Sequence, residues 1–268
     1  MEMSGTTGSD PADGGPSRTL GPAGLGVIGV GVVLGAVTWW VGLPHGVTVF
    51  GEDAAPLTGA AALFMALAGI SVAGALGHRG TWRVVDIVVA SVLGVVGGVF
   101  FWGVGTAWTP VTEALKLVPP SVALLNGLWL VPGVLGGLVI RKPGAAIYVE
   151  LVGAVLEALL GDQFGFGSVY YGLLQGLGAE FVLALLFYRS FSLVPAMLAG
   201  VGAGLADGLL DVTVAYPLLG PGVKAGYLVL TMLSGAVVAG CGAWALVRAL
   251  ARTGVLAPLA AGRSAELV

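Results

Sequence analysis

The segment GAAIYVELVGAVLEALLG, residues 144–161, is an apolar stretch that nevertheless carries two carboxylates, Glu150 and Glu157. They are seven residues apart, two helical turns, and therefore lie on one face of a helix. Charged side chains are costly in lipid, so they normally face a cavity or a partner. The segment predicts a membrane helix that turns one face toward a polar interior.

The composition of the whole chain agrees with this interpretation. Hydrophobic residues make up 57% of the 268 positions, charged residues 9%, and the mean hydropathy is +1.00. These values lie far outside the usual range of soluble domains and predict an all-α, polytopic membrane protein. A span needs roughly 20 apolar residues. Windows of about that length lie at 24–43, 55–77, 83–103, 122–140, 144–161, 168–188, 192–212 and 226–249.

The basic residues predict the orientation. If the spans alternate in direction, only Lys116 and Lys224 fall on one side. Nine others fall on the opposite side: Arg18, Arg79, Arg83, Arg141, Lys142, Arg189, Arg248, Arg252 and Arg263. This positive-inside bias predicts a multi-pass protein of the cell membrane with both termini in the cytoplasm.

The chain divides into four predicted parts. Residues 1–20 are rich in Gly, Ser, Pro and Asp, and we expect a disordered cytoplasmic tail there. Residues 21–80 hold two additional transmembrane helices, residues 81–257 form a six-helix unit, and residues 258–268 form a second cytoplasmic tail.

Polar residues recur in the spans that follow residue 161. The segment YYGLLQGLGAEF contains Gln175 and Glu180, and GAGLADGLLDV contains Asp207 and Asp211. The predicted topology puts Glu157, Gln175 and Asp207 in the outer half, Glu180 nearer the middle and Glu150 deeper toward the cytoplasm. Several acids on adjacent helices predict a polar pocket that opens to the outside. Alternatively, single members of the set are structural, each making an interhelical hydrogen bond from a protonated carboxyl group.

Aromatic residues complete the predicted pocket. Trp129 lies inside a span with Asn126 one turn earlier, and it is the best candidate to stack on a ligand. Tyr170 belongs to a group of aromatic residues near the outer helix ends, where such residues also serve as interfacial anchors. A flat, partly cationic solute suits aromatic faces and a carboxylate. We expect the outer loop from Thr106 to Ser121 to serve as a lid.

Several classes of site are not supported by the sequence. His45 and His78 are remote from the acids, and a metal site of carboxylates alone would be unusual in this setting. No nucleophile with a nearby histidine base, zinc-protease motif or phosphate-binding loop occurs. The net charge is −3, with no basic patch for nucleic acid. We expect neither a cofactor nor catalysis, and any coupling to ATP must come from another chain.

Small residues form two stripes. Ala90, Gly94 and Gly98 repeat every four residues, and Gly200, Gly204 and Gly208 do the same later in the chain. Such stripes let helices approach closely, either within the protein or against a partner.

Three segments carry a resemblance to a known family. They are NGLWLVPGVLGGLVIRKPGAAIYVELVGAVLEALLG (126–161), QGLGAE (175–180) and LVPAMLAGVGAGLADGLLD (193–211). Over residues 81–257 the chain resembles the YkoE-type S component of energy-coupling factor (ECF) transporters. The resemblance implies a six-helix substrate-binding subunit for thiamine or hydroxymethylpyrimidine, preceded here by two extra helices. It also implies work with a transmembrane coupling subunit and two cytoplasmic ATPases, which hydrolyse the ATP.

The resemblance also implies roles for particular residues. Glu157 or Glu180 would accept hydrogen bonds from the exocyclic amine of an aminopyrimidine, and Trp129 or Tyr170 would stack on a ring. Gln175 and Asn126 would pair with ring nitrogens or a hydroxyl group. The full substrate-binding set is Glu157, Glu180, Gln175, Trp129, Asn126, Glu150, Tyr170 and Asp207. The stripe Ala90, Gly94 and Gly98 would contact the coupling subunit.

Two other classes of function remain open. In a proton- or sodium-coupled carrier of a small organic cation, Glu150, Glu180 and Asp207 would relay ions. In an intramembrane enzyme, paired carboxylates would do acid and base work on a lipid or lipid-linked substrate.

Overall fold

The computed structural model describes residues 48–49, 52–53, 82–114 and 117–265. This part of the chain is all-α except for a two-residue antiparallel ladder between β1 (Thr48–Val49) and β2 (Glu52–Asp53). Apart from that ladder, the predicted tail at 1–20 and the two predicted helices in 21–80 lie outside the described residues.

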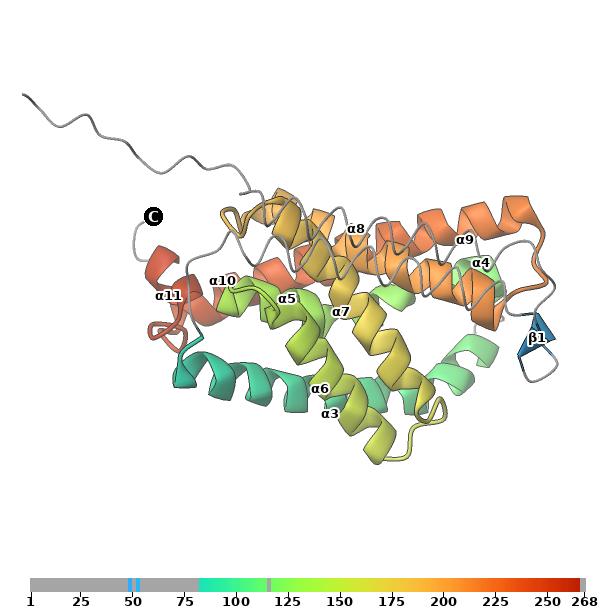
Figure 1. Ribbon diagram of the computed structural model, residues 1–268, viewed down its shortest axis with the longest axis horizontal. Helices are drawn as coiled ribbons and strands as arrows, with labels where there is room; N and C mark the ends of the chain where they lie inside the picture. The colour runs from blue at the N-terminus through green and yellow to red at the C-terminus, as the bar shows by residue number, and fades with distance from the viewer. Residues whose placement is uncertain (1–47, 50–51, 54–81, 115–116, 266–268) are drawn as a thin grey trace, which may run out of the picture.

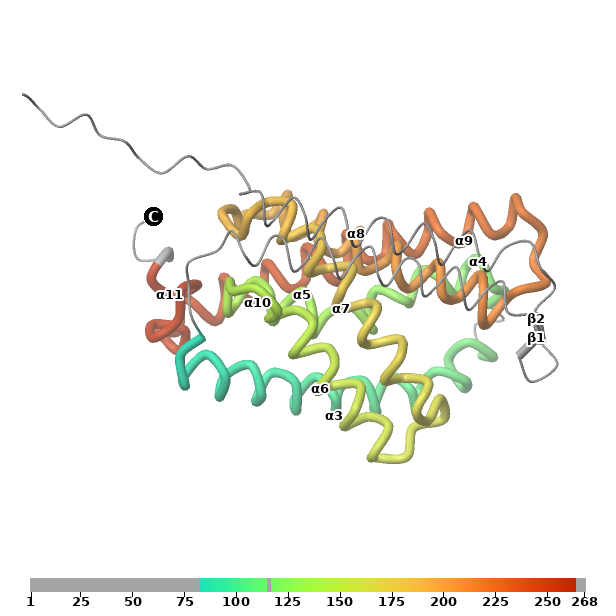
Figure 2. Tube along the Cα trace, in the orientation of Figure 1, coloured from blue at the N-terminus to red at the C-terminus, as the bar shows by residue number. Residues whose placement is uncertain are grey.

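The helices form an elongated bundle (Figures 1 and 2). The described chain after residue 81 runs through six helical units, three of which change helix type along their length. The single α-helices are α3 (Val84–Ala114), α6 (Ala145–Leu159) and α7 (Gly167–Leu185). The first composite unit consists of α4 (Pro119–Val122), the 3-10 helix η1 (Asn126–Leu130) and α5 (Val131–Ile140). The second consists of α8 (Leu193–Leu210) and the π-helix η2 (Asp211–Ala215). The third consists of α9 (Pro221–Ser234), the π-helix η3 (Gly235–Cys241) and α10 (Gly242–Arg252). A short helix, α11 (Ala260–Ala265), follows.

Five of these six units are long and apolar enough to cross a membrane: Val84–Ala114, Pro119–Ile140, Gly167–Leu185, Leu193–Ala215 and Pro221–Arg252. The protein is therefore a multi-pass membrane protein. The exception is α6, whose 15 residues extend only about 22 Å, less than a bilayer core. The helix is shorter than the predicted segment 144–161 because glycines with positive φ, Gly144 (84°) and Gly161 (81°), bound it.

The first helix of the bundle is longer than predicted. It runs for 31 residues to Ala114, whereas the sequence predicts an end near residue 103. The hydroxyl groups of Thr106 and Thr112 donate to the carbonyl groups of Trp102 and Trp108, four residues earlier in each case. This spacing is typical of threonine side chains within a helix. The prediction of a lid loop from Thr106 onward is thus wrong for most of its length, because this segment continues α3 and Pro119 begins α4.

The predicted stripe on α3 packs inside the chain. Ala90, Gly94 and Gly98 are buried, and Gly94 and Gly98 face α6. A Cβ atom on Gly94 would lie 2.6 Å from Val152 Cγ1, and one on Gly98 would lie 2.7 Å from the Gly153 carbonyl oxygen. Gly94 and Gly98 thus let α3 and α6 approach each other closely.

The second stripe makes a similar internal contact. A Cβ atom on Gly200 would clash with the Gly235 carbonyl oxygen, and one on Gly204 would lie 2.7 Å from the Thr231 carbonyl oxygen. Close approach of α8 to α9 and η3 therefore depends on these small residues.

One end of the bundle is tied together by polar contacts around the turn between α5 and α6. Lys142 Nζ lies 2.6 Å from Asp86 Oδ2, and Trp82 Nε1 donates to the Pro143 carbonyl oxygen over 3.0 Å. The guanidinium group of Arg83 forms an ion pair with Asp86 and also donates a hydrogen bond to the Pro258 carbonyl oxygen. Residue 258 begins the segment that the sequence assigns to a tail, and the next residue, Leu259, is buried.

Most basic residues of the described chain belong to helix ends at the left of Figure 1, where α3 begins and α5, α7 and α10 end. These residues are Arg83, Arg141, Lys142, Arg189, Arg248 and Arg252. Lys224, in contrast, lies near the start of α9, which is at the other end of the bundle (Figure 1).

Candidate functional site

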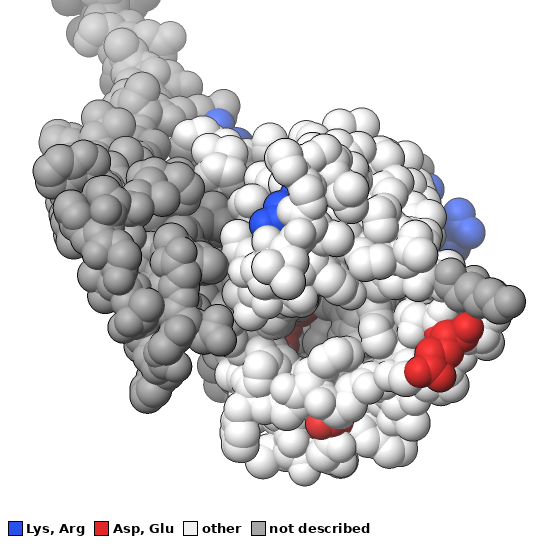
Figure 3. Space-filling model, turned by 90° about the vertical axis from the view of Figure 1, so that its right-hand side faces the viewer, with Lys and Arg blue, Asp and Glu red and all other residues white. Residues whose placement is uncertain are grey.

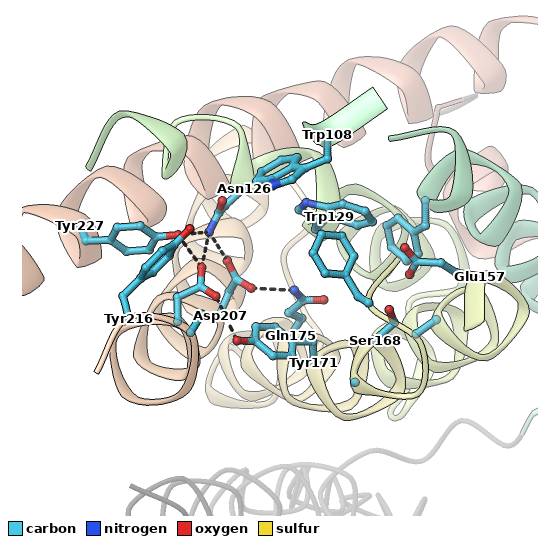
Figure 4. A pocket seen from close by; sticks show the side chains of 16 residues that line it. Trp108, Asn126, Trp129, Glu157, Ser168, Tyr171, Gln175, Asp207, Tyr216 and Tyr227 are labelled. Carbon is cyan, nitrogen blue, oxygen red and sulfur yellow. Dashed lines mark hydrogen bonds between the residues drawn. The ribbon is translucent and has the colours of Figure 1, made fainter. Parts of the chain in front are cut away.

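A cavity of about 260 Å³ lies between α3, η1, α6, α7, the α8–η2 unit and α9. It lies toward the end of the bundle opposite the basic residues, since its lining includes Trp108 near the end of α3 and Tyr216 directly after η2. Figure 3 shows this end of the molecule, which is hollowed and has acidic side chains inside the hollow. The cavity has an aromatic side and a polar side (Figure 4).

Trp129 is the centre of the aromatic side. Its ring centroid lies 5.6 Å from that of Phe101, 5.8 Å from that of Trp108 and 5.7 Å from that of Phe164. Such tilted and edge-to-face pairs hold a ring in a fixed orientation. The side of the cavity around Trp129 therefore offers a rigid apolar surface to a flat ligand.

Asn126 and Trp129 reach the same cavity because of the local helix type. They are three residues apart in η1, and side chains at i and i+3 of a 3-10 helix lie directly above one another. Trp129 thereby contributes to the aromatic side, while Asn126 contributes to the polar side (Figure 4).

The polar side is built around two carboxylates. The side-chain amide of Asn126 lies 2.8 Å from Asp207 Oδ2 and 2.7 Å from Asp211 Oδ2, so it donates to both. Gln175 Nε2 donates to the other oxygen of Asp207 over 2.7 Å. Asn126 and Gln175 thus hold the carboxylates in place.

Tyrosine hydroxyl groups complete the polar side. Tyr227 donates to Asp211 Oδ2 over 2.6 Å, and Tyr171 donates to Asp211 Oδ1 over 3.1 Å. Asp211 begins the π-helix η2, a helix type that is frequent at functional sites. Tyr216 follows η2 and packs on Tyr227, and burial together with the negative charge of Asp211 raises the pKa of Tyr216.

Glu157 is the third carboxylate of the cavity. It lies on the aromatic side, across the cavity from Asp207 (Figure 4), and its side chain is only 2% exposed. Its Oε1 atom has no hydrogen-bond partner. Burying a carboxylate oxygen without a hydrogen-bond partner is energetically costly. A ligand that donates a hydrogen bond to this oxygen would remove the cost and would therefore bind more tightly.

Glu180, another predicted ligand, lies elsewhere. Its Oε1 accepts from the backbone N–H of Gly144 over 2.7 Å and from the Tyr188 hydroxyl over 2.6 Å, and its Oε2 accepts from the N–H of Ala146 over 3.0 Å. Glu180 therefore caps the start of α6, near the turn at the basic end of the bundle and not near the middle. Burial and the carboxylate of Glu180 raise the pKa of the Tyr188 hydroxyl.

Two further predicted ligands are also outside the cavity lining. Glu150 is 1% exposed, and one carboxylate oxygen accepts from the backbone N–H of Gly133 while the other has no partner. Tyr170 is 39% exposed, and the next residue, Tyr171, lines the cavity instead. The structure thus gathers Asn126, Trp129, Glu157, Gln175 and Asp207, but not Glu150, Tyr170 or Glu180.

The predicted set leaves out several residues that the cavity uses. Tyr171 lies four residues before Gln175 on α7, and Asp211 lies four residues after Asp207, so helical spacing from the chosen residues would have found both. Tyr227 and Tyr216 carry no comparable signal in the sequence, because their contacts with Asp211 depend on how α9 packs.

All the charged residues that line the cavity are acidic. Among the residues that line this cavity, Glu157, Asp207 and Asp211 are acidic and none is Lys, Arg or His. In the described part of the chain, no group of three or more His, Cys, Asp or Glu residues is arranged to hold a metal ion. The arrangement is suited to an organic ligand with an aromatic ring, hydrogen-bond donors and a positive charge.

Three comparisons with known proteins each match a component of a transport system. Residues 85–206 match a family model described as "ABC-type cobalt transport system, permease component". The chain is 35% identical over 186 residues to "Putative HMP/thiamine permease protein YkoE" of Bacillus subtilis (strain 168), an alignment that covers 68% of this chain and 92% of the relative. It also matches a crystal structure of an S-component of an ECF transporter with a TM-score of 0.66 and 34% identity, over 69% of this chain and 94% of the other.

Proposed function

This chain belongs to the YkoE family of ECF-transporter S components, and on that premise we propose that it binds thiamine or hydroxymethylpyrimidine from outside the cell as the substrate-binding subunit of an ATP-driven importer. The observation that carries this proposal is the cavity, which combines a rigid aromatic surface at Trp129 with carboxylates at two ends. The relative's name supplies the two candidate ligands.

Both candidate ligands contain an aminopyrimidine ring. In our proposal the ring stacks on Trp129, and its exocyclic amine donates to the unpartnered oxygen of Glu157. A site that offers buried acceptors rejects an analogue without the amine, because the carboxylate would then stay desolvated and unpaired.

The geometry refines the roles of the two amides. The Nδ2 group of Asn126 has two hydrogens, which the carboxylates of Asp207 and Asp211 both accept. Asn126 is therefore a positioning residue in this proposal. Gln175 uses one N–H on Asp207 and keeps its second N–H and its carbonyl oxygen as groups that can pair with ligand nitrogens or a hydroxyl.

We further propose that both termini are cytoplasmic and that the cavity faces outward. The basic residues at one end of the bundle support this orientation by the positive-inside rule, and the cavity lies toward the other end. The substrate would then enter through the hollow shown in Figure 3.

Import in this proposal needs a transmembrane coupling subunit and two cytoplasmic ATPase subunits. The chain itself would bind substrate and move against the coupling subunit, while ATP is hydrolysed in the separate subunits. Since Ala90, Gly94 and Gly98 are buried and the two glycines pack on α6, we expect other residues to form the surface that meets the coupling subunit.

One observation favours a second candidate, a proton- or sodium-coupled carrier. Glu150 is buried and one of its oxygens has no partner, and buried ionisable residues of membrane proteins often belong to proton relays. The two functions differ in their energy source. Purified chain in vesicles would accumulate substrate under an ion gradient if it is a carrier, whereas an S component would accumulate it only with the coupling and ATPase subunits and ATP.

The experiment that tests the proposed function is calorimetric titration of the full chain in detergent with thiamine and with hydroxymethylpyrimidine. The proposal expects saturable binding of at least one ligand, weakened by Glu157→Gln. Glu113→Gln is the matched control, since it removes one carboxylate from an exposed position near the end of α3, outside the cavity. Folded wild-type protein that binds neither ligand would refute the proposal.

A further inference from the structure

We propose that the groove between α7 and α8 binds an acyl chain of an anionic phospholipid, with the lipid phosphate at Arg189 where the groove ends. This α7–α8 groove has a volume of about 300 Å³, and its lining includes Phe181, Val182, Leu185 and Leu186 on α7 and Leu198 and Leu205 on α8. None of the described residues that line it also lines the cavity around Trp129. The lipid site is therefore separate from the cavity of the proposed function.

The α7–α8 groove lies where two glycines let the helices cross closely. Gly202 on α8 lies against Gly178 on α7, and a Cβ atom on Gly202 would lie 2.6 Å from Val182 Cγ2. Gly202 also lines the groove, and it has no side chain to fill the space there. The hollow beside the crossing thus follows from the small residues at these two positions.

The α7–α8 groove suits a hydrocarbon chain. All its described lining residues are hydrophobic or glycine, so no side chain among them can hydrogen-bond a polar ligand. Leu185, Leu198 and Leu205 are 53%, 44% and 39% exposed, so neighbouring side chains leave much of their surface uncovered. Unfilled space beside apolar side chains forfeits dispersion contacts. A flexible acyl chain can restore these contacts, since it adapts to an irregular surface.

The position of the groove along the helices places the headgroup at the loop between them. Leu198 lies five residues after Leu193, where α8 begins, which is about 7.5 Å along the helix axis, and Ala206 lies about 12 Å further. Residues 186–192 join α7 to α8 at the basic end of the bundle. A lipid with its phosphate beside this loop would therefore direct an acyl chain into the groove.

Arg189 in this loop supplies a positive charge for the phosphate. Its guanidinium carbon lies 5.5 Å from the centre of the Phe187 ring, a contact that helps to hold the charged group in place. Arg189 is exposed and forms no ion pair with another described residue. Ser190 and Ser192 are also exposed, and their hydroxyl groups can donate to phosphate oxygens. The loop thus offers one cation and two neutral donors to a headgroup.

The acidic residues near this end of the bundle do not compete for Arg189. Asp86 forms ion pairs with Arg83 and Lys142, and Glu180 is 1% exposed and accepts from the start of α6. Basic sites between membrane helices bind the headgroups of anionic lipids. A zwitterionic lipid would gain less from Arg189, because the cation of its headgroup offsets the charge of its phosphate.

The test is native mass spectrometry of the full chain in detergent, with phosphatidylglycerol or phosphatidylcholine of identical acyl chains. We expect the wild-type chain to retain phosphatidylglycerol roughly fivefold more strongly, the factor that one arginine near an anionic headgroup contributes. Arg189→Gln should reduce this ratio to about one. Arg252→Gln is the matched control, since it removes an exposed arginine at the same end of the bundle, on α10 and outside the groove, and it should leave the ratio unchanged.

Leu198→Trp tests the groove itself. The larger side chain should fill space that the acyl chain would use and should lower the retention of both lipids by at least about threefold. The melting temperature in detergent without added lipid reports whether the variant is folded. Unchanged retention of both lipids by folded Leu198→Trp would show that the acyl chain binds elsewhere and would overturn the proposal.

Three further results would overturn the proposal. Equal retention of the two lipids by the wild-type chain would exclude a headgroup site, and this comparison does not depend on any variant. Equal losses in Arg189→Gln and Arg252→Gln would point to the general charge of the basic end instead of the groove. Retention of neither lipid by the wild-type chain would mean that another segment of the chain fills the groove.

Discussion

The carboxylate of Glu180 accepts a hydrogen bond from the backbone N–H of Gly144 over 2.7 Å. This contact joins the C-terminal half of α7 to the start of α6, and the same carboxylate also accepts from the N–H of Ala146. The first N–H groups of a helix have no partner within the helix, and a negative charge there also interacts favourably with the helix dipole. Glu180, on α7, thus stabilises the turn before α6, whereas Glu157, near the other end of α6, lines the cavity.

Replacing Glu180 by Gln should destabilise the protein without changing its affinity for ligand. The substitution removes the negative charge from an acceptor of three hydrogen bonds, and it turns an amide N–H₂ group toward backbone donors. We expect the free energy of unfolding to fall by about 2 to 3 kcal/mol. The apparent melting temperature in detergent should therefore fall. Calorimetry on the folded fraction should give wild-type affinity, and a specific loss of binding with an unchanged melting temperature would contradict this role.

Glu157 and Glu150 should differ in their effect on binding, although both are buried on one face of α6. Glu157→Gln should weaken the preferred ligand by roughly tenfold, because an amide N–H₂ group replaces one of the two carboxylate oxygens that can accept from the ligand. Glu150→Gln should change affinity by less than about twofold, since Glu150 accepts from Gly133 outside the lining. Calorimetric titration of the two variants side by side compares their dissociation constants. Equal losses of affinity would contradict the prediction that only Glu157 contacts the ligand.

Trp129 should contribute to binding through its ring rather than its polar N–H group. Trp129→Ala removes the centre of the aromatic side and should cost about 2 kcal/mol of binding free energy, whereas Trp129→Phe should retain most of the affinity. The ratio of the two dissociation constants is the measurement. Similar losses in both variants would indicate that the indole N–H, and not stacking, holds the ligand.

Gly98 and Gly103 on α3 should respond to alanine in opposite directions. A Cβ atom at Gly98 would lie 2.7 Å from the Gly153 carbonyl oxygen, so Gly98→Ala should destabilise the isolated subunit by about 1 to 3 kcal/mol. At Gly103 nothing lies within 4 Å, and Gly103→Ala should stabilise the helix by up to about 1 kcal/mol. Melting temperatures of the two variants test this contact, and a stable Gly98→Ala subunit that fails only in transport would instead favour a partner contact there.

Much of the architecture could be predicted from local features of the sequence. The apolar composition determines that the chain folds in lipid, and the positions of the hydrophobic windows predict the helices because a span must satisfy its backbone hydrogen bonds internally. The helical period also places Glu150 and Glu157 on one face, as observed. The 31-residue length of α3 was not predicted, since its last turns lie in a polar and proline-containing segment that sequence patterns assign to a loop.

The roles of the acids were decided only by tertiary structure. Residue type establishes that a carboxylate in an apolar helix needs a partner, but it does not specify which partner. Packing gives Glu180 the free N–H groups at the start of α6 and gives Asp207 and Asp211 a common donor in Asn126, while one oxygen of Glu157 stays unpaired beside the cavity. The cost of burying charge is a local property that sequence shows, whereas hydrogen-bond geometry depends on distances between segments far apart in the chain, which only the folded bundle determines.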